Sequence, residues 1–228
     1  MIRGLEYYAT PEPFTTWLFA EMAHQGVPIV GRLFEPCVGD GAIIRAAGLR
    51  PMEFGVDNTW ITNDLDSRWL ADFHFDAADA WLPHLAFDAI DWTVTNPPFT
   101  LAIQILERAL VHSRVGVAMH LRASIHEVLK RGVRRHWMAD NLPTGILWLP
   151  RFAYQRSPTT GKWTTDSVCA CWVIWVKPGA LGERRQFFKY APISVIDQLD
   201  ALTPTYRRSM DAMMAGVVLP SVDPRLLT

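Results

Sequence analysis

The sequence predicts an α/β fold: one mostly parallel β-sheet with helices on both faces and an antiparallel hairpin at one edge. Segments rich in β-branched and apolar residues alternate with segments of helical periodicity over the first 150 residues, a pattern typical of such a sheet. The last two strand-like segments, 145–149 and 167–176, are joined by a polar loop without a helix, which predicts the hairpin. With 228 residues the chain is long enough for one sizeable domain and too short for two.

Local signals place the individual elements. Thr10 is expected to be the N-cap of the first helix and Pro11 its first residue, and apolar residues follow at helical spacing as far as Gly26. Further helices are predicted at 42–47, 100–112 and 125–137. Strands are predicted at 32–35, 59–63, 73–76, 92–95, 115–121, 145–149 and 167–176. The chain is therefore expected to be a single domain, 1–228, with a core over about 7–177 and a C-terminal extension, 178–228, that has two short helical patterns.

The composition predicts a folded protein of a reducing compartment. Hydrophobic residues make up 50% of the chain and include ten tryptophans, which predicts a packed core rather than disorder. No uncharged apolar run of 18 residues and no signal pattern is present, so we expect a soluble, unexported protein without membrane contact. The three cysteines and seven histidines lack metal-ligand spacing, so we expect a cytoplasmic protein without a metal. His120 falls in a predicted strand and is expected to be a core histidine.

The charge balance bears on the class of partner. A net charge of −1 is low for a nucleic-acid-binding protein, because phosphate neutralisation dominates the affinity of such proteins. Positive charge is nevertheless concentrated locally, at Lys130, Arg131, Arg134 and Arg135. This cluster is either a phosphate-binding face or an ordinary solvated helix face.

The most informative motif is Asn96-Pro97-Pro98-Phe99, between a β-branched run and a helical pattern. Two prolines end a strand and fix a rigid loop at its carboxyl end, which is where open α/β sheets hold their ligands. The Asn96 side-chain oxygen and the Pro97 carbonyl can each accept one N–H of an exocyclic amine, while Phe99 stacks on the ring that bears it. The motif therefore predicts a site for a planar aromatic amine.

A second motif lies upstream, at 35–41, where a strand ends in an acid and a glycine-containing turn leads into a helix. Gly39 and Gly41 allow close approach of the backbone to a cofactor. Glu35 and Asp40 would repel phosphate, which favours a cationic or neutral cofactor over a nucleotide phosphate.

The two motifs together resemble the amino-group DNA methyltransferases that use S-adenosylmethionine. The resembling features are Glu-Pro-x-x-Gly-x-Gly followed by Asn-Pro-Pro-Phe, and an N-terminal segment, 7–13, similar to the one that closes over the methionine end of the cofactor in that family. The resemblance extends over roughly residues 7–177 and is strongest to short phage-type adenine methyltransferases. It implies a Rossmann-like class I methyltransferase fold with a mostly parallel seven-stranded sheet, and S-adenosyl-L-methionine as the cofactor.

The resemblance also implies which residues form the cofactor site. These are Tyr8, Thr10, Pro11, Glu35, Pro36, Gly39, Gly41, Asp57, Asp64 and Asp76. Either Asp57 or Asp64 would bind the ribose hydroxyls from the end of the second strand, and the run before Asp64 is richer in β-formers, which favours Asp64. Asp76 would contact the adenine amine of the cofactor.

The expected chemistry assigns catalysis to Asn96, Pro97, Pro98 and Phe99. In the family a second aromatic from a later loop contacts the flipped-out base, and here Tyr154 fits best, with Phe152 as the alternative; both could instead be core aromatics. Arg151, Arg134 and Arg135 are candidates for phosphate contacts.

The expected reaction is methylation of the exocyclic N6 amine of adenine in DNA, in the cytoplasm of a bacterial or phage-infected cell. The alternatives are cytosine-N4 methylation of DNA, methylation of an RNA base or of a protein glutamine, and a non-catalytic nucleic-acid-binding module. The chain lacks a separate target-recognition domain, so we expect a short recognition site or almost none. The sequence leaves the oligomeric state open, a homodimer included.

Overall fold

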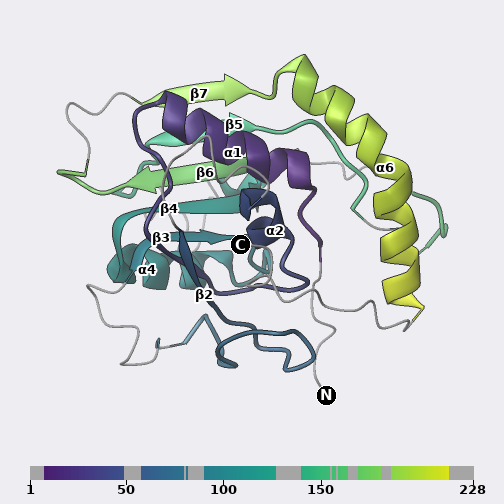
Figure 1. Ribbon diagram of the computed structural model, residues 1–228, viewed down its shortest axis with the longest axis horizontal. Helices are drawn as coiled ribbons and strands as arrows, with labels where there is room; N and C mark the ends of the chain where they lie inside the picture. Colours follow the sequence, from purple (N-terminus) through teal and green to yellow (C-terminus); the bar gives the residue numbers. More distant parts are fainter. Residues whose placement is uncertain are drawn as a thin grey trace.

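A computed structural model of the chain describes residues 8–48, 58–79, 81, 90–126, 140–154, 156–157, 159–163, 169–180 and 186–215. Within these residues, seven strands form one sheet in the order β2-β1-β3-β4-β6-β5-β7 (Figure 1). The strands are β1 (Arg32–Glu35), β2 (Thr59–Thr62), β3 (Ile90–Thr95), β4 (Ser113–Arg122), β5 (Gly145–Trp148), β6 (Ala170–Val176) and β7 (Phe187–Tyr190). The helices are α1 (Glu12–His24), α2 (Ala42–Gly48), α4 (Ala102–His112) and α6 (Ile193–Met214), and a 3₁₀ turn covers Ala123–His126.

The sheet is mostly parallel. β1 pairs in parallel with β2 and β3, β3 with β4, and β5 with β7, whereas β6 is antiparallel to both β4 and β5. β6 is therefore the one described strand that runs against the others. The predicted fold class is confirmed, including the antiparallel pairing of β5 with β6.

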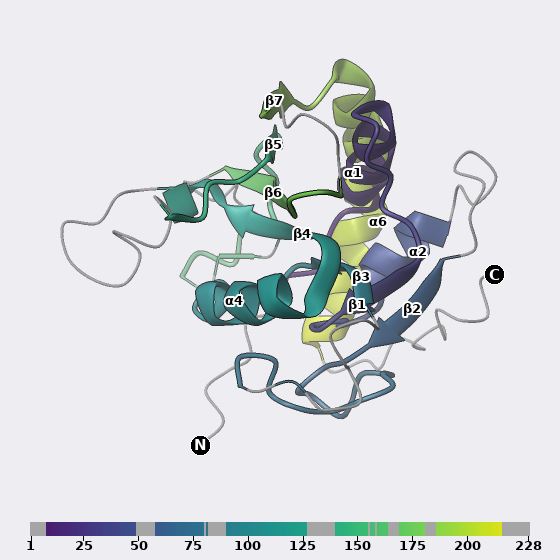
Figure 2. The ribbon, with the colours of Figure 1, turned by 90° about the vertical axis from the view of Figure 1, so that its left-hand side faces the viewer.

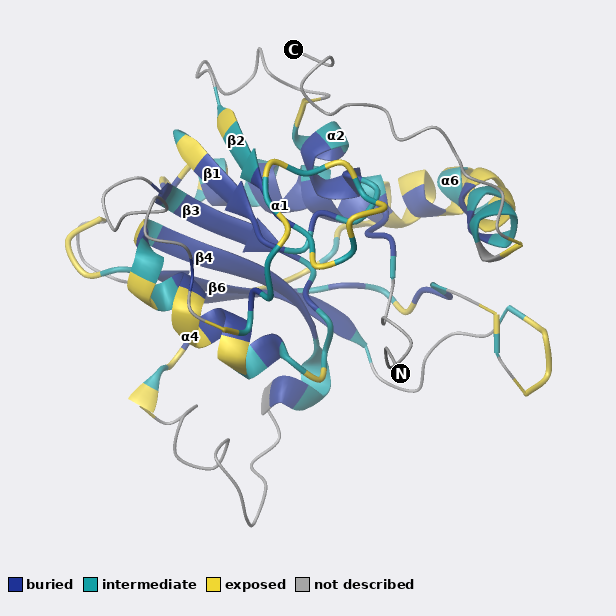
Figure 3. Cartoon of the chain, turned by 90° about the horizontal axis from the view of Figure 1, so that it is seen from below, coloured by how far each residue is buried: buried dark blue, intermediate teal, exposed yellow. Residues whose placement is uncertain are grey.

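Two hydrophobic cores lie on opposite faces of the sheet. On one face, α1 and α6 pack against Trp92, Ala118 and Trp172, and on the other face α4 packs against Val117 and Met119. Figure 2 shows α4 on one side of the strands and α1 and α2 on the other. Because side chains alternate between faces along a strand, successive residues of β4 and β6 enter different cores. The central strands are consequently buried on both sides, as the dark blue of β3, β4 and β6 in Figure 3 indicates.

The carboxyl ends of the parallel strands meet at one edge of the sheet, and the sequence motifs lie there. β1 ends at Glu35, β2 at Thr62, β3 at Thr95 and β4 at Arg122. The glycine turn follows β1 and the Asn-Pro-Pro-Phe loop follows β3, and β1 and β3 are neighbours in the sheet. The fold therefore brings the two motifs side by side.

Three predictions from the sequence are wrong, and a fourth falls mostly on residues that the structure does not describe. The segment 73–76 is not a strand, because Phe73 forms only a single bridge with Asn63; β7, in the supposed extension, is the seventh strand instead. The extension also contains one helix of 22 residues, α6, rather than two short ones. Thr10 is not the N-cap of α1, since Pro11 holds that position without a side-chain cap. The predicted helix 125–137 lies almost wholly outside the described residues, which end at 126 before that gap.

Candidate active site

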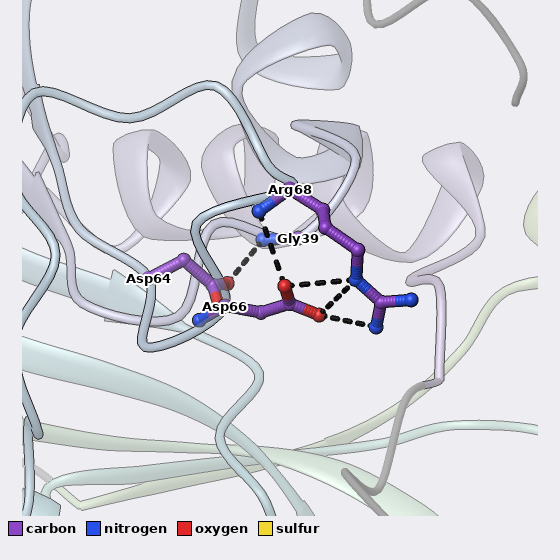
Figure 4. Close-up of polar contacts among 4 residues, drawn as sticks. All are labelled: Gly39, Asp64, Asp66 and Arg68. Carbon is purple, nitrogen blue, oxygen red and sulfur yellow. Dashed lines mark hydrogen bonds and ion pairs between the residues drawn. The ribbon is translucent and has the colours of Figure 1, made fainter.

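The turn after β1 is shaped by two glycines and tied to the neighbouring strand. Gly39 and Gly41 have φ angles of 51° and 77°, a region that residues with a side chain rarely adopt. The Gly39 N–H donates to Asp64 Oδ2 at 2.9 Å, and the Val38 N–H donates to the Asn63 carbonyl at 2.9 Å. Figure 4 shows Asp64 directed at the Gly39 backbone, with the Asp66–Arg68 ion pair beside it. The turn is therefore held against the segment that follows β2.

Asn63 fixes the walls of this part of the site. Its side-chain amide is completely buried and donates to the Pro36 carbonyl at 2.9 Å and to the Phe75 carbonyl at 3.1 Å, while its oxygen accepts from the Phe75 N–H at 3.0 Å. One side chain thus links the glycine turn to the segment before Asp76. Asp76 itself is half-buried and accepts from the Ala78 N–H at 2.9 Å.

Glu35 is a buried acid with an unsatisfied oxygen. The residue is 1% exposed; its Oε1 accepts from the Cys37 N–H at 3.3 Å, and its Oε2 is buried near the Thr95 hydroxyl without a well-formed hydrogen bond among the described residues. Burial raises the pKa of the Glu35 carboxyl well above its usual range, and the same effect together with the nearby acids raises the pKa of the Cys37 thiol. A buried carboxylate oxygen needs a partner, so this position suits a cationic group of a ligand.

The two candidate ribose acids differ in position. Asp64 lies two residues beyond the end of β2, half-buried, whereas Asp57 precedes β2 and lies outside the described residues. Burial raises the pKa of Asp64 above its usual range. Among the described residues, Asp64 follows the second strand, β2, where the resemblance expects the acid. Asp40, by contrast, accepts from the Ala42 N–H and pairs with Arg45, so it caps α2.

Asn96 is held by three hydrogen-bond partners in the N-terminal segment and in β4. Its Nδ2 donates to the Tyr8 carbonyl at 2.8 Å and lies 3.0 Å from Thr10 Oγ1, and its Oδ1 lies 3.2 Å from His120 Nδ1. Pro97 is buried, and Asn96 and Phe99 are half-buried. Hydrogen bonds from Asn96 to the N-terminal segment and to β4 thus hold the Asn-Pro-Pro-Phe loop in place.

Aromatic side chains of three segments contact one another near the Asn-Pro-Pro-Phe loop. Tyr8 stacks on Phe99 with ring centroids 5.6 Å apart and an interplanar angle of 25°, and Tyr8 meets Tyr154 edge-on at 6.1 Å. The Arg122 guanidinium lies 4.9 Å from the centroid of Phe99. Phe152, the alternative to Tyr154, is 6% exposed and packs edge-on against Phe14, Tyr154 and Tyr206. Tyr154 is the one of the two that contacts Tyr8, the ring that stacks on Phe99.

Two residues of this site were not expected from the sequence. His120 is completely buried, as a core histidine should be, yet it joins Asn96 to Tyr154, whose hydroxyl lies 3.2 Å from His120 Nε2. Burial lowers the pKa of His120 to about 3, which keeps the imidazole neutral. Tyr206 of α6 places its hydroxyl 3.0 Å from the Ala9 carbonyl and 3.2 Å from the Tyr154 carbonyl. The one signal in the sequence was the position of His120 near the end of a strand that leads to the site.

The candidate phosphate contacts remain predictions. Arg151 is exposed, and Arg134 and Arg135 lie outside the described residues. Arg156 pairs with Asp211 of α6 at 2.6 Å and lies 5.3 Å from the Trp163 ring centroid.

Two absences concern the described part of the chain. No helix there is both long and apolar enough to span a bilayer. No group of three or more His, Cys, Asp or Glu side chains there is arranged to hold a metal ion.

Comparison with known proteins gives matches in structure but not in sequence. No family model and no curated protein matches the sequence. The fold is similar to the methyltransferase subunit of a type I restriction-modification system from Streptococcus thermophilus, with a TM-score of 0.57, 13% identity, and coverage of 88% of this chain and 53% of that chain. It is also similar to a provisionally assigned class I S-adenosylmethionine-dependent methyltransferase from Listeria monocytogenes, with a TM-score of 0.56, 12% identity, and coverage of 90% and 74%.

A third similar structure is the modification subunit of a provisionally assigned type I restriction enzyme from Vibrio vulnificus YJ016, with a TM-score of 0.51 and 12% identity. This chain spans 53% of the length of each of the two restriction-system subunits. The chain has the Rossmann-like class I methyltransferase fold. At 12–13% identity the comparisons show the fold alone, and the activity of this chain has to be argued from its own site.

Proposed function

We propose that this protein is an S-adenosylmethionine-dependent methyltransferase that acts on the exocyclic N6 amine of adenine in DNA, with short or little sequence specificity. The observation that carries the proposal is the Asn96 amide. Its N–H groups face Tyr8 and Thr10, and its oxygen faces His120, in the loop that also carries Phe99. The glycine turn and the buried carboxyl of Glu35 lie at the end of the neighbouring strand.

The residues of the first motif suit this cofactor. S-adenosylmethionine is cationic, and it supplies a sulfonium methyl group to a nucleophile. The unsatisfied Oε2 of Glu35 would accept from the ammonium group of the cofactor, which supports a cationic ligand over a phosphate. Gly39 would allow the backbone to approach the cofactor closely, Asp64 would accept from the ribose hydroxyls, and Asp76 would accept from the adenine amine. Tyr8, Thr10 and Pro11 precede α1 and would cover the methionine end.

The second motif suits an aromatic amine. Such an amine is a poor nucleophile, because its lone pair is delocalised into the ring. Asn96 Oδ1 and the Pro97 carbonyl would each accept one N–H, which favours a pyramidal nitrogen with a localised lone pair. The amine would accept the methyl group that the bound cofactor supplies, with the thioether as leaving group, and would lose one proton to solvent. Positioning and fixed dipoles supply the rate enhancement in this scheme.

The target base has to leave the duplex to reach this loop. Phe99 would stack on the flipped-out base, and Tyr154 would contact it from a second loop. Because Tyr8 already stacks on Phe99, an incoming base competes with the Tyr8 ring for that surface. Phosphate contacts by Arg134, Arg135 and Arg151 are part of the proposal.

One experiment tests the proposed function. The protein is incubated with S-adenosylmethionine and either DNA or RNA, the nucleic acid is digested to nucleosides, and the methylated base is identified by mass. N6-methyladenine from DNA is the expected product, and an adenine-free DNA strand is the matched control. N4-methylcytosine or a methylated RNA base would change the assigned substrate. The absence of both methyl transfer and cofactor binding would contradict the proposal as a whole.

A further inference from the structure

The polar contacts of Asn96 fix which way its amide points. The Tyr8 carbonyl can only accept a hydrogen bond, so the atom 2.8 Å from it must be the NH₂ group of Asn96. Thr10 Oγ1, 3.0 Å away, accommodates the second hydrogen of the same group. The amide oxygen of Asn96 is thereby turned toward His120, at 3.2 Å.

This orientation also fixes the tautomer of His120. An amide oxygen only accepts, so the hydrogen of this contact is on Nδ1 of the imidazole. A neutral imidazole has one donor and one acceptor, and its Nε2 therefore accepts from the Tyr154 hydroxyl at 3.2 Å. The deep burial of His120 disfavours the charged form, in which Nε2 could not accept. Hydrogen bonds run in one direction, from Tyr154 through His120 to Asn96.

The surroundings of His120 are otherwise apolar. Its ring stacks on Phe14 with an interplanar angle of 17° and meets Trp172 edge-on at 5.3 Å. A phenylalanine could make the same ring contacts without the cost of burying an imidazole. Both ring nitrogens of His120 instead form hydrogen bonds with residues of the candidate active site: Asn96 in the loop after β3 and Tyr154 in the loop after β5.

We propose that His120 is a positioning residue that holds the Asn96 oxygen toward the target amine and couples it to Tyr154, the proposed second contact of the target base. An amide oxygen has two lone pairs. His120 occupies one, which leaves one acceptor direction for an amine N–H. The inference deepens the proposed function and rests on it, since Asn96 is the group that touches the substrate.

Three substitutions of His120 separate its two hydrogen bonds from its packing. His120→Asn keeps an amide N–H near the Nδ1 position and loses the contact with Tyr154. His120→Gln places its amide near the Nε2 position and loses the contact with Asn96. His120→Phe keeps the ring contacts and loses both hydrogen bonds. His24→Phe, at an exposed position in α1, is the control.

The turnover of these variants tests the inference. We expect kcat to fall about 10- to 100-fold in His120→Gln and His120→Phe, to recover to within about fivefold of the unchanged protein in His120→Asn, and to stay unaltered in the control. The Kd for S-adenosylmethionine should change less than about threefold in all four, because both hydrogen bonds of His120 go to Asn96 and Tyr154 and not to the glycine turn. A folded His120→Phe protein with undiminished kcat would overturn the inference, as would a His120→Asn protein no faster than His120→Gln.

A second measurement does not depend on turnover. The ¹⁵N spectrum of the labelled imidazoles, assigned by the signal that disappears in His120→Phe, should show the Nδ1–H tautomer for His120 at neutral pH. In Asn96→Ala that preference should be lost. An Nε2–H tautomer in the unchanged protein would overturn the inference. If Asn96→Ala abolishes methyl transfer while His120→Phe does not affect it, the inference fails and the proposed function stands; if Asn96→Ala turns over normally, the proposed function fails first.

Discussion

Glu35→Gln should make the protein without cofactor more stable and should weaken cofactor binding. In the folded protein burial raises the pKa of Glu35 above its ordinary value of 4.5, so between 4.5 and the raised pKa the folded state binds one more proton than the unfolded state. The free energy of unfolding therefore falls as pH rises through this window, by up to about 1.4 kcal/mol per pH unit, and is lowest above the raised pKa. Glutamine keeps the shape and the acceptor for the Cys37 N–H, and it removes this slope.

The same substitution removes the charge that the cofactor is proposed to need. A hydrogen bond to a charged group is worth about 1.5–3 kcal/mol, so the Kd for S-adenosylmethionine should rise about 10- to 150-fold. Below the raised pKa, binding of the cationic cofactor should ionise Glu35 and release up to about one proton per cofactor. Calorimetry in buffers of different ionisation enthalpy measures both the Kd and the proton release, and denaturant unfolding at several pH values measures the stability.

Glu107→Gln is the matched control, because it makes the same change of charge on the exposed face of α4. It should leave the affinity, the proton release and the pH dependence of stability close to those of the unchanged protein. An unaltered cofactor affinity in Glu35→Gln, together with the same proton release as the unchanged protein, would refute the assignment of Glu35 to the cofactor.

Three further predictions concern the other parts of the site. Asp64→Ala should weaken S-adenosylmethionine binding more than Asp57→Ala, because Asp64 follows β2 whereas Asp57 precedes it; the reverse order by calorimetry would show that the ribose acid is misassigned. Phe99→Ala should cost about 1–3 kcal/mol in binding of a single-stranded adenine-containing oligonucleotide, and an unchanged affinity would remove Phe99 from the base pocket. The double substitution Arg134→Ala and Arg135→Ala should weaken DNA binding about equally for all sequences and lower the salt slope by up to about one per lost phosphate contact, whereas an unaltered salt slope would move the DNA-binding face elsewhere.

Most strands of the sheet were predictable because local sequence composition indicates them. β1, β3, β4 and β6 are runs rich in apolar or β-branched residues, and each was expected within a few positions of its observed ends. β7 was missed because its pairing depends on a distant contact: the Phe187 ring fills the space over Gly145 of β5, and nothing in the sequence near Phe187 signals that partner.

α6 was read as two short helices for a physical reason. Pro204 lies inside it, and a proline ordinarily ends or kinks a helix. Burial of Val195, Leu199, Tyr206 and Met210 along one side of the helix favours its continuation through Pro204. Tertiary packing thus outweighed the local preference. The continued helix places the Tyr206 hydroxyl against the Ala9 and Tyr154 carbonyls.

The parts of the site that were expected from the sequence are those built into local motifs. Glu35 is the last residue of β1, Gly39 lies in the turn after β1, and Asn96 directly follows β3. His120, by contrast, acquires its contacts from residues 24 and 34 positions away, and those contacts depend on the order of strands in the sheet. The sequence also misassigned Thr10, whose hydroxyl contacts Asn96 instead of capping α1.

The central claim is that the Asn96 amide acts on a nucleobase amine, and methyl transfer by Asn96→Ala measures it most directly. The single-turnover rate of N6-methyladenine formation in DNA should fall about 100- to 1000-fold, because the amide acts in the transition state, while the Kd for S-adenosylmethionine stays within about threefold. The melting temperature of the cofactor-bound variant verifies that it is folded. Retention of the full methylation rate by folded Asn96→Ala would contradict the claim and make the Asn-Pro-Pro-Phe loop a structural turn.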